Sequence, residues 1–139
     1  MGKLIKALHT GISVVNMEEA IAWYEKNLDF VKIKDDYVPP LKARLVFIEN
    51  KAIDYQIELF QYDEPNPVPP ERLTPNSDLQ TAGTKHVAFE VDDMASLKEK
   101  FLANNVDIAH ACISDIRSQA VVPHLHKRSR KSCIPSPFS

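Results

Sequence analysis

The chain has 139 residues, 44 % of them hydrophobic and 26 % charged, with a net charge of −2, as is ordinary for a soluble globular domain. This length can bury one hydrophobic core without disulfide or metal staples, and the charge gives no electrostatic argument for nucleic-acid binding. No apolar run reaches the roughly 18 residues of a membrane span, and no signal-peptide hydrophobic stretch is visible at the start. Cys112 and Cys133 show no CxxC spacing, so we expect free thiols in a cytoplasmic protein.

The first 62 residues predict one β-α-β-β-β module. Residues 6–15 (KALHTGISVV) alternate as a strand does. Asn16 and Glu19 have capping-box spacing, and an apolar stripe predicts a helix from there to about Asn27. Strands are expected over residues 30–38, 43–49 and 54–62, the first two separated by Pro39 and Pro40.

Residues 63–82 read as a linker. They contain five prolines, so we expect no regular helix or central strand there. Proline-rich segments are stiff and extended, so this one is expected to cross between two halves of a single structural domain.

After the linker, in residues 83–139, the pattern restarts as a second module. A strand is expected over residues 84–91, a cap at Asp92 or Asp93, a helix over residues 94–104 and a further strand over residues 106–113. The beginning of the second module repeats the beginning of the first at an offset of 77 positions, and such repeats are typical of paired structural units. The aligned pairs are His9 with His86, Asn16 with Asp93, Met17 with Met94, Tyr24 with Phe101 and Asn27 with Asn104.

Three residues form a candidate metal site: His9, Glu58 and His86. Either histidine alone is more often a hydrogen-bonded structural residue, but their equivalence in the repeat predicts matching positions near a pseudo-two-fold axis, and imidazole is a common ligand of Zn, Ni, Fe and Mn. Glu58 shares one side of its strand with Gln56 and Phe60, and a carboxylate is costly to bury there unless it is paired or metal-bound. The alternative is that this side of the sheet faces water.

Three segments resemble the vicinal oxygen chelate superfamily: LHTGISVVNMEEAIAWYEKNLDF, YQIELFQY and GTKHVAFEVDDMASL, within about residues 4–110. That superfamily includes glyoxalase I, extradiol dioxygenases, methylmalonyl-CoA epimerase and the fosfomycin and bleomycin resistance proteins. The resemblance implies an α+β fold in which two β-α-β-β-β modules form a cupped mixed sheet around a metal cavity. It also implies metal ligands on the first and fourth strands of each module, and His9, Glu58 and His86 fall on three of these four positions.

An acid at position 58 resembles glyoxalase more than the epimerases. It implies a metal-dependent lyase or isomerase that acts on a small α-oxo or vicinally oxygenated substrate, with Glu58 also moving a proton. The first helix lacks the arginine often associated with glutathione-dependent members, and Arg44, Gln56 and Phe60 are candidate substrate contacts. The alternatives are an Fe(II) extradiol-type ring-cleaving dioxygenase and a non-catalytic small-molecule-binding protein of the resistance type. We expect a homodimer with a divalent metal, and no nucleic-acid or membrane partner.

The composition changes near residue 111. Residues 111–139 carry a net charge of +4 and residues 1–110 a net charge of −6. The fourth ligand position of the superfamily corresponds to Pro135, and no acidic residue follows Asp115. Three explanations stay open: the end of the chain is unrelated to the family's last strands, for example through a reading-frame slip; His124 or His126 replaces the carboxylate; or three protein ligands and water suffice.

Overall fold

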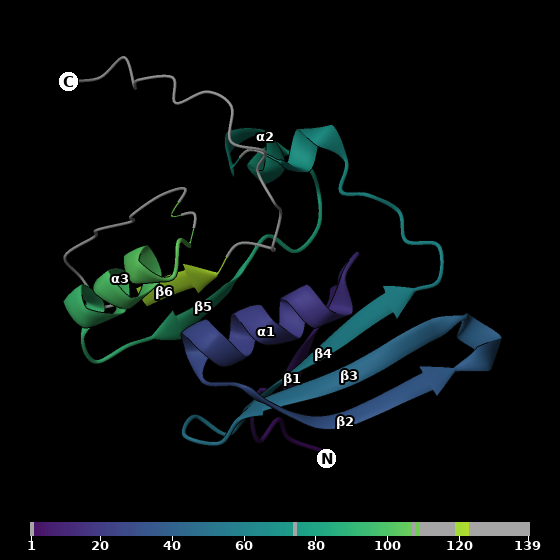
Figure 1. The fold of residues 1–139 in the computed structure, drawn as a ribbon, viewed down its shortest axis with the longest axis horizontal. Coiled ribbons are helices and arrows are strands. Elements are labelled where there is room, and N and C mark those ends of the chain that lie inside the picture. The colour runs from purple at the N-terminus through teal and green to yellow at the C-terminus, as the bar shows by residue number, and fades with distance from the viewer. Residues whose placement is uncertain (1, 74, 107, 109–118, 123–139) are drawn as a thin grey trace.

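The computed structural model describes residues 2–73, 75–106, 108 and 119–122 (Figure 1). Its first module contains β1 (His9–Ser13), α1 (Met17–Leu28), β2 (Val31–Val38), the short 3-10 helix η1 (Pro39–Leu41), β3 (Ala43–Asn50) and β4 (Tyr55–Tyr62). These strands form one sheet in the order β1-β4-β3-β2, with β1 parallel to β4 and the other neighbours antiparallel. The predicted β-α-β-β-β order is therefore confirmed, although β1 is shorter than the strand expected over residues 6–15.

Helix α1 begins and ends where local chemistry requires. The side chain of Asn16 accepts a hydrogen bond from the backbone N–H of Glu19 at 3.2 Å, as in a capping box. The helix ends at Asp29, which adopts a left-handed conformation with φ 57°. The buried side of α1 carries Tyr24, and burial raises the pKa of its hydroxyl to about 12. The helix thus covers one side of the sheet with an apolar stripe (Figure 1).

Alternation along the strands divides the sheet into two faces. Ile57 and Leu59 of β4 and Val46 and Ile48 of β3 are at most 1 % exposed and pack beneath α1. Because successive side chains of a strand point to opposite faces, the intervening residues point away from α1. We call this second side the open face, and on β1, β4 and β3 it carries His9, Gly11, Ser13, Gln56, Glu58, Phe60, Leu45, Phe47 and Glu49.

Strand β2 is an edge of this sheet and is solvent-exposed over nearly all of its length. Its pairing with β3 is interrupted by an irregularity between Lys32 and Lys34. Two ion pairs lie along it, Lys32 with Asp35 at 2.8 Å and Lys34 with Asp36 at 3.0 Å. This edge is therefore bulged and covered by charged side chains.

The linker contains more regular structure than its prolines predict. It holds η2 (Pro70–Arg72) and the helix α2 (Pro75–Gln80), so the expectation that no helix forms there was wrong. The reason is position: proline is tolerated in the first turn of a helix, where its missing N–H has no intrahelical partner in any case. Asp78 fixes this segment by accepting hydrogen bonds from Arg72 at 2.8 Å and from Lys85 at 3.3 Å.

The second half begins as the first does and then differs. Strand β5 (Val87–Glu90) leads into α3 (Met94–Ala103), whose cap Asp93 accepts hydrogen bonds from the backbone of Ala95 and Ser96. However, β5 pairs antiparallel with β6 (Gln119–Val122), whereas β1 pairs parallel with β4. Most of the strand expected over residues 106–113, and the predictions concerning positions 124, 126 and 135, lie outside the described residues. No helix in the described part of the chain is long and apolar enough to cross a bilayer.

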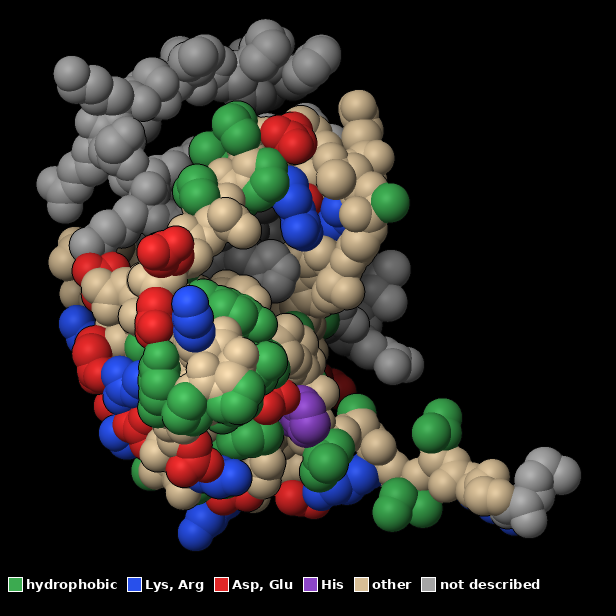
Figure 2. Space-filling view, turned by 90° about the vertical axis from the view of Figure 1, so that its right-hand side faces the viewer, with side chains coloured by type: hydrophobic (Ala, Val, Ile, Leu, Met, Phe, Trp, Pro, Cys, Tyr) green, Lys and Arg blue, Asp and Glu red, His purple; other side chains and the backbone are tan. Residues whose placement is uncertain are grey.

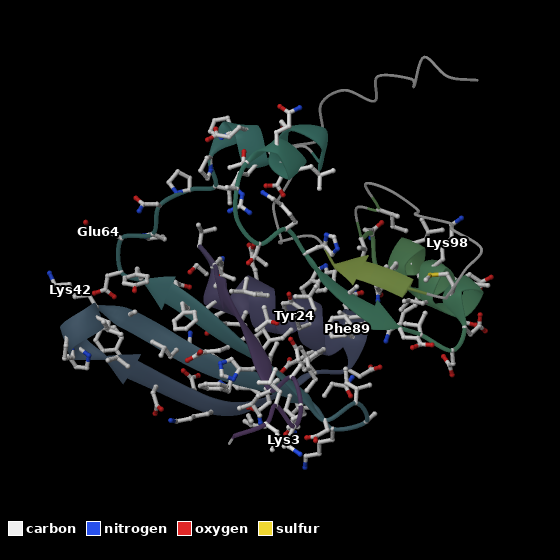
Figure 3. All side chains as sticks on the ribbon, turned by 180° about the vertical axis from the view of Figure 1, so that it is seen from behind. Lys3, Tyr24, Lys42, Glu64, Phe89 and Lys98 are labelled. Atoms are coloured by element: carbon white, nitrogen blue, oxygen red, sulfur yellow. The ribbon has the colours of Figure 1, made fainter. Side chains whose placement is uncertain are left out.

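The two halves meet through residues that the repeat makes equivalent. The side-chain amide of Asn104 donates to the side-chain oxygen of Asn27 at 3.0 Å, across a separation of 77 positions. Between β5 and α1, Figure 3 shows Phe89 near Tyr24, and both rings contact Phe30, at centroid distances of 6.1 and 5.7 Å. The offset found in the sequence thus corresponds to a direct contact between the ends of α1 and α3.

Candidate functional site

His9 and Glu58 come together on the open face. In the parallel register of β1 and β4, His9 lies opposite Gln56, and Gly11 lies opposite Glu58. His9 and Glu58 are therefore diagonal neighbours, and Nε2 of His9 is 3.4 Å from Oε2 of Glu58. Gly11 has no side chain to stand between them. The two side chains are 34 % and 18 % exposed, so the pair is accessible to solvent from one side.

This pair fits two neighbouring ligand positions of a divalent metal. Two donors that each lie about 2.1 Å from one metal are about 3.0–3.4 Å apart for bond angles between about 90° and 110°. The observed separation of 3.4 Å is at the upper end of that range. Imidazole nitrogen and carboxylate oxygen are also the donor types that Zn, Ni, Mn and Fe share.

His86 is placed differently. It immediately precedes β5, and its side chain is exposed. Within the described residues, no three His, Cys, Asp or Glu side chains are grouped closely enough to hold a metal together. The structure therefore brings together two of the three residues predicted as ligands. That these residues and His86 bind a metal stays a prediction, which for His86 rests on its equivalence to His9.

Arg44 does not lie at this site. It alternates in phase with Val46, which is buried under α1, so its guanidinium is on the helix side of the sheet. There it donates two hydrogen bonds to Asp35, at 2.8 and 2.7 Å, and one to Glu18 of α1. These carboxylates hold the pKa of Arg44 above its usual range. The structure thus places Arg44 on the other side of the sheet from His9 and Glu58, and its role as a substrate contact stays a prediction.

The surroundings of the pair are largely aromatic. Phe47, the cross-strand neighbour of Glu58 on β3, makes an edge-to-face contact with the His9 ring at a centroid distance of 5.7 Å. Phe60 lies over Gly11 so closely that a Cβ added there would be 3.1 Å from its ring. Phe60 is thus on the open face as predicted.

A polar pair borders this aromatic surface. The Gln56 amide, also on the open face as predicted, is 3.4 Å from a carboxylate oxygen of Glu49 on β3. Neither Glu49 nor Phe47 was identified from the sequence. Alternation along residues 43–50 groups the two, but only the register with β4 places them beside His9 and Glu58.

Contacts on the helix side hold β1 and β4 in this register. The side-chain oxygens of Thr10 and Tyr55 share a hydrogen bond between the two strands. At the other end, Gln61 accepts a hydrogen bond from the backbone N–H of Met17, the first residue of α1. The backbone N–H of Val14 also donates to the carbonyl of Phe60 at 2.8 Å. The position of His9 relative to Glu58 is therefore set by the sheet and by the start of α1.

Comparison with known proteins agrees with this architecture. SMU.1112c has a similar crystal structure, with a TM-score of 0.58 and 23 % sequence identity over 74 % of this chain and 77 % of that one. A glyoxalase family protein from Enterococcus faecalis gives a TM-score of 0.54 and 18 % identity over 74 % of this chain and 73 % of that one. These likenesses show the fold alone. No curated protein matches the chain significantly.

A family model covers most of the chain. The model described as the glyoxalase/bleomycin resistance protein/dioxygenase superfamily matches residues 8–120. The match includes β1, the linker and β5, and it extends as far as the beginning of β6. The chain belongs to the glyoxalase/bleomycin resistance protein/dioxygenase superfamily, that is, to the vicinal oxygen chelate superfamily.

Proposed function

We propose that the protein is a metal-dependent lyase or isomerase of the glyoxalase type that acts on a small α-oxo or vicinally oxygenated substrate. The observation that supports this most is the His9–Glu58 pair, with Nε2 and Oε2 at 3.4 Å on neighbouring first and fourth strands. A nitrogen and a carboxylate oxygen at this spacing suit a divalent metal. His86 is the third proposed ligand because it repeats His9.

The two residues of the pair have different roles in the proposal. Bound there, a divalent metal would act as a Lewis acid toward the substrate's oxygens and leave coordination positions for them. His9 would be a ligand of that metal. Glu58 would be a ligand and also a general base. For a substrate with a hydroxyl group beside a carbonyl group, Glu58 takes the proton from the carbon that bears the hydroxyl and returns it to the neighbouring carbonyl carbon, while the hydroxyl proton passes to the former carbonyl oxygen. The substrate is isomerised with no net oxidation and no co-reactant.

The aromatic surroundings serve this proton transfer. Phe47 and Phe60 flank Glu58 and limit the access of water to it from β3 and from the far end of β4. A carboxylate that must carry the same proton between two carbons is more effective where few waters exchange with it. The contact between Phe47 and the ring of His9 also restricts the orientation of the imidazole.

The test is metal content and affinity in a set of matched variants. The protein is purified, loaded separately with Zn, Ni, Mn and Fe(II), and its bound metal is measured by mass spectrometry. His9→Ala and Glu58→Gln are expected to lower the metal affinity at least 10-fold. A similar loss in His86→Ala would identify His86 as the third ligand. Glu64→Gln is the control, because Glu64 is exposed and lies beyond the end of β4, on the side of the sheet where Figure 3 labels it near Lys42.

The outcomes separate the alternatives. Metal binding that is weakened by His9→Ala, together with isomerisation of an α-oxo substrate that Glu58→Gln abolishes, supports the proposal. Unchanged metal content in both His9→Ala and Glu58→Gln contradicts it. Preferential retention of iron with oxygen consumption on a catechol would instead favour the ring-cleaving dioxygenase.

A further inference from the structure

His9 lies where the sheet is least firmly held. It is the first residue of β1, a strand of five residues at one edge of the sheet. Residues 2–8 before it are exposed, and Figure 2 shows this start of the chain projecting from the body of the molecule. The ends of short edge strands open readily, because few buried contacts hold them. A metal ligand at this position therefore needs a further contact that fixes the strand beside it.

Tyr55 supplies such a contact from the other side of the sheet. Its hydroxyl shares a hydrogen bond with the hydroxyl of Thr10, the residue that follows His9. Both side chains are half-buried, and Tyr55 is next to Gln56, the partner of His9 in the parallel register. Because Thr10 follows His9 directly, a hydrogen bond that holds Thr10 against β4 also limits the movement of the His9 backbone.

The ring of Tyr55 contacts the second half of the chain. It makes an edge-to-face contact with Phe89 of β5, at a centroid distance of 5.8 Å. Phe89 also contacts Phe30 of the core at 6.1 Å. His86 precedes Phe89 by three residues, just before β5 begins. The contacts that place β5 therefore also place His86.

Both histidines are on sides that face away from Tyr55. Successive side chains of a strand point to opposite faces, so His9 lies on the open face while Thr10 and Tyr55 lie behind it. His86 is an odd number of residues from Phe89, so a strand continued back to His86 would direct its side chain away from Tyr55. Tyr55 thus supports both proposed ligands from behind, through the residues beside them.

We propose that Tyr55 is a positioning residue for the metal site: its hydroxyl fixes His9 through Thr10, and its ring fixes His86 through Phe89. The proposal rests on the proposed function, since it takes both histidines as ligands. Tyr55 acts through the two strands and not by contact with the metal. Loss of its hydroxyl therefore weakens metal binding only while His9 is present, and loss of the Phe89 ring does so only while His86 is present.

The test measures two quantities in each variant: the dissociation constant for Zn, by competition with a chelating dye, and the free energy of unfolding of the metal-free protein in urea. Tyr55→Phe removes the hydroxyl and keeps the ring, and Thr10→Val removes the other partner of the same hydrogen bond. Each is expected to raise the dissociation constant about 5-fold, the net contribution of one hydrogen bond. The double variant Tyr55→Phe/Thr10→Val is expected to raise it no further. Thr10→Ser keeps the hydroxyl and should bind Zn as the unaltered protein does.

Backgrounds that lack one histidine identify the path of the effect. Tyr55→Phe is expected to leave the Zn affinity of His9→Ala unchanged and to weaken that of His86→Ala about 5-fold. Phe89→Leu removes the ring contact and keeps an apolar side chain, and it is expected to show the reverse. Tyr62→Phe is the control, because it removes a hydroxyl from the other end of β4 and should leave the Zn affinity unchanged.

Two outcomes would overturn the proposal. One is a loss of stability in Tyr55→Phe with unchanged Zn affinity, which is what a purely structural residue would give. The other is an equal loss of Zn affinity from Tyr55→Phe with and without His9, or from Phe89→Leu with and without His86. If the unaltered protein binds no metal, or if His9→Ala leaves the affinity unchanged, the proposed function fails and this inference fails with it. If His9→Ala weakens binding and neither Tyr55→Phe nor Thr10→Val does, the inference fails alone.

Discussion

The contact between Asn27 and Asn104 provides a direct test of how the two halves are joined. Asn27 is 3 % exposed, its amide group donates to the carbonyl of Trp23 at 3.0 Å, and its oxygen accepts from Asn104 at 3.0 Å. Asn104→Ala removes that donor and leaves a buried oxygen without it. A buried polar atom deprived of its partner costs about 1–3 kcal/mol, so we expect a loss of about 1.5 kcal/mol in the free energy of unfolding.

Asn27→Ala should cost somewhat more, because it removes the hydrogen bond to Trp23 as well. The double variant Asn27→Ala/Asn104→Ala leaves neither partner orphaned. Its loss is therefore expected to be about 1 kcal/mol smaller than the sum of the two single losses. With a urea m-value of about 1–3 kcal/mol/M for a small domain, each single variant would lower the urea midpoint by about 0.5–1.5 M.

The assay is equilibrium urea unfolding followed by Trp23 fluorescence, since that ring also contacts Phe101 of α3 at a centroid distance of 6.2 Å. Asn50→Ala is the matched control: the Asn50 amide donates to the carbonyl of Leu28 at 2.9 Å, entirely within the first half. The pair Asn50→Ala and Asn104→Ala should be additive. Additivity for Asn27 and Asn104 as well would refute the contact between equivalent residues of the repeat.

Two further predictions concern the sheet. Arg44 and Lys32 hold the pKa of the Asp35 carboxyl below its usual range, so its charged form stabilises the fold above about pH 4. This contribution is lost as the pH falls through the lowered pKa. Asp35→Asn should therefore flatten the acid side of a plot of unfolding free energy against pH, and an unchanged slope would contradict this. Gly11→Ala places a Cβ 3.1 Å from the Phe60 ring, and the resulting shift of that ring should lower the free energy of unfolding by about 1 kcal/mol and weaken metal binding. Thermal unfolding and metal titration measure the two effects. Ser13→Ala, on the same strand, is the control and should change neither stability nor metal affinity.

Much of the first half was predictable from the sequence, because each element carries its own signal. Alternation in residues 54–62 defined β4 and put Glu58 on the side opposite Ile57. The cap at Asn16 and the stripe behind it defined α1. Asp92 or Asp93 was expected to cap the second helix, and Asp93, which the repeat aligns with Asn16, does so.

What could not be predicted depends on register and on pairing between distant segments. Nothing local in residues 43–50 says that Phe47 lies beside Glu58 or that Arg44 faces α1; both follow from the way β3 aligns with β4. The proline content of the linker did not indicate α2, the short helix that begins at Pro75. Proline content is an average over a segment and does not show that this proline occupies the first turn of a helix, where proline is tolerated. The antiparallel pairing of β5 with β6 joins residues about 30 positions apart, beyond the reach of periodicity.

The irregular and charged strand β2 affects how readily molecules of this chain associate with one another. The sheet of the first module has β1 and β2 at its edges, and β5 pairs with β6 and with neither of them. An edge strand is a template for pairing with another chain, and the exposed apolar side chains of Val31, Ile33 and Tyr37 would favour such pairing at β2. The strand pairing is irregular between Lys32 and Lys34, and ion pairs of lysine and aspartate cover the edge. Both features hinder the flat approach of a second strand, so they disfavour aggregation through β2.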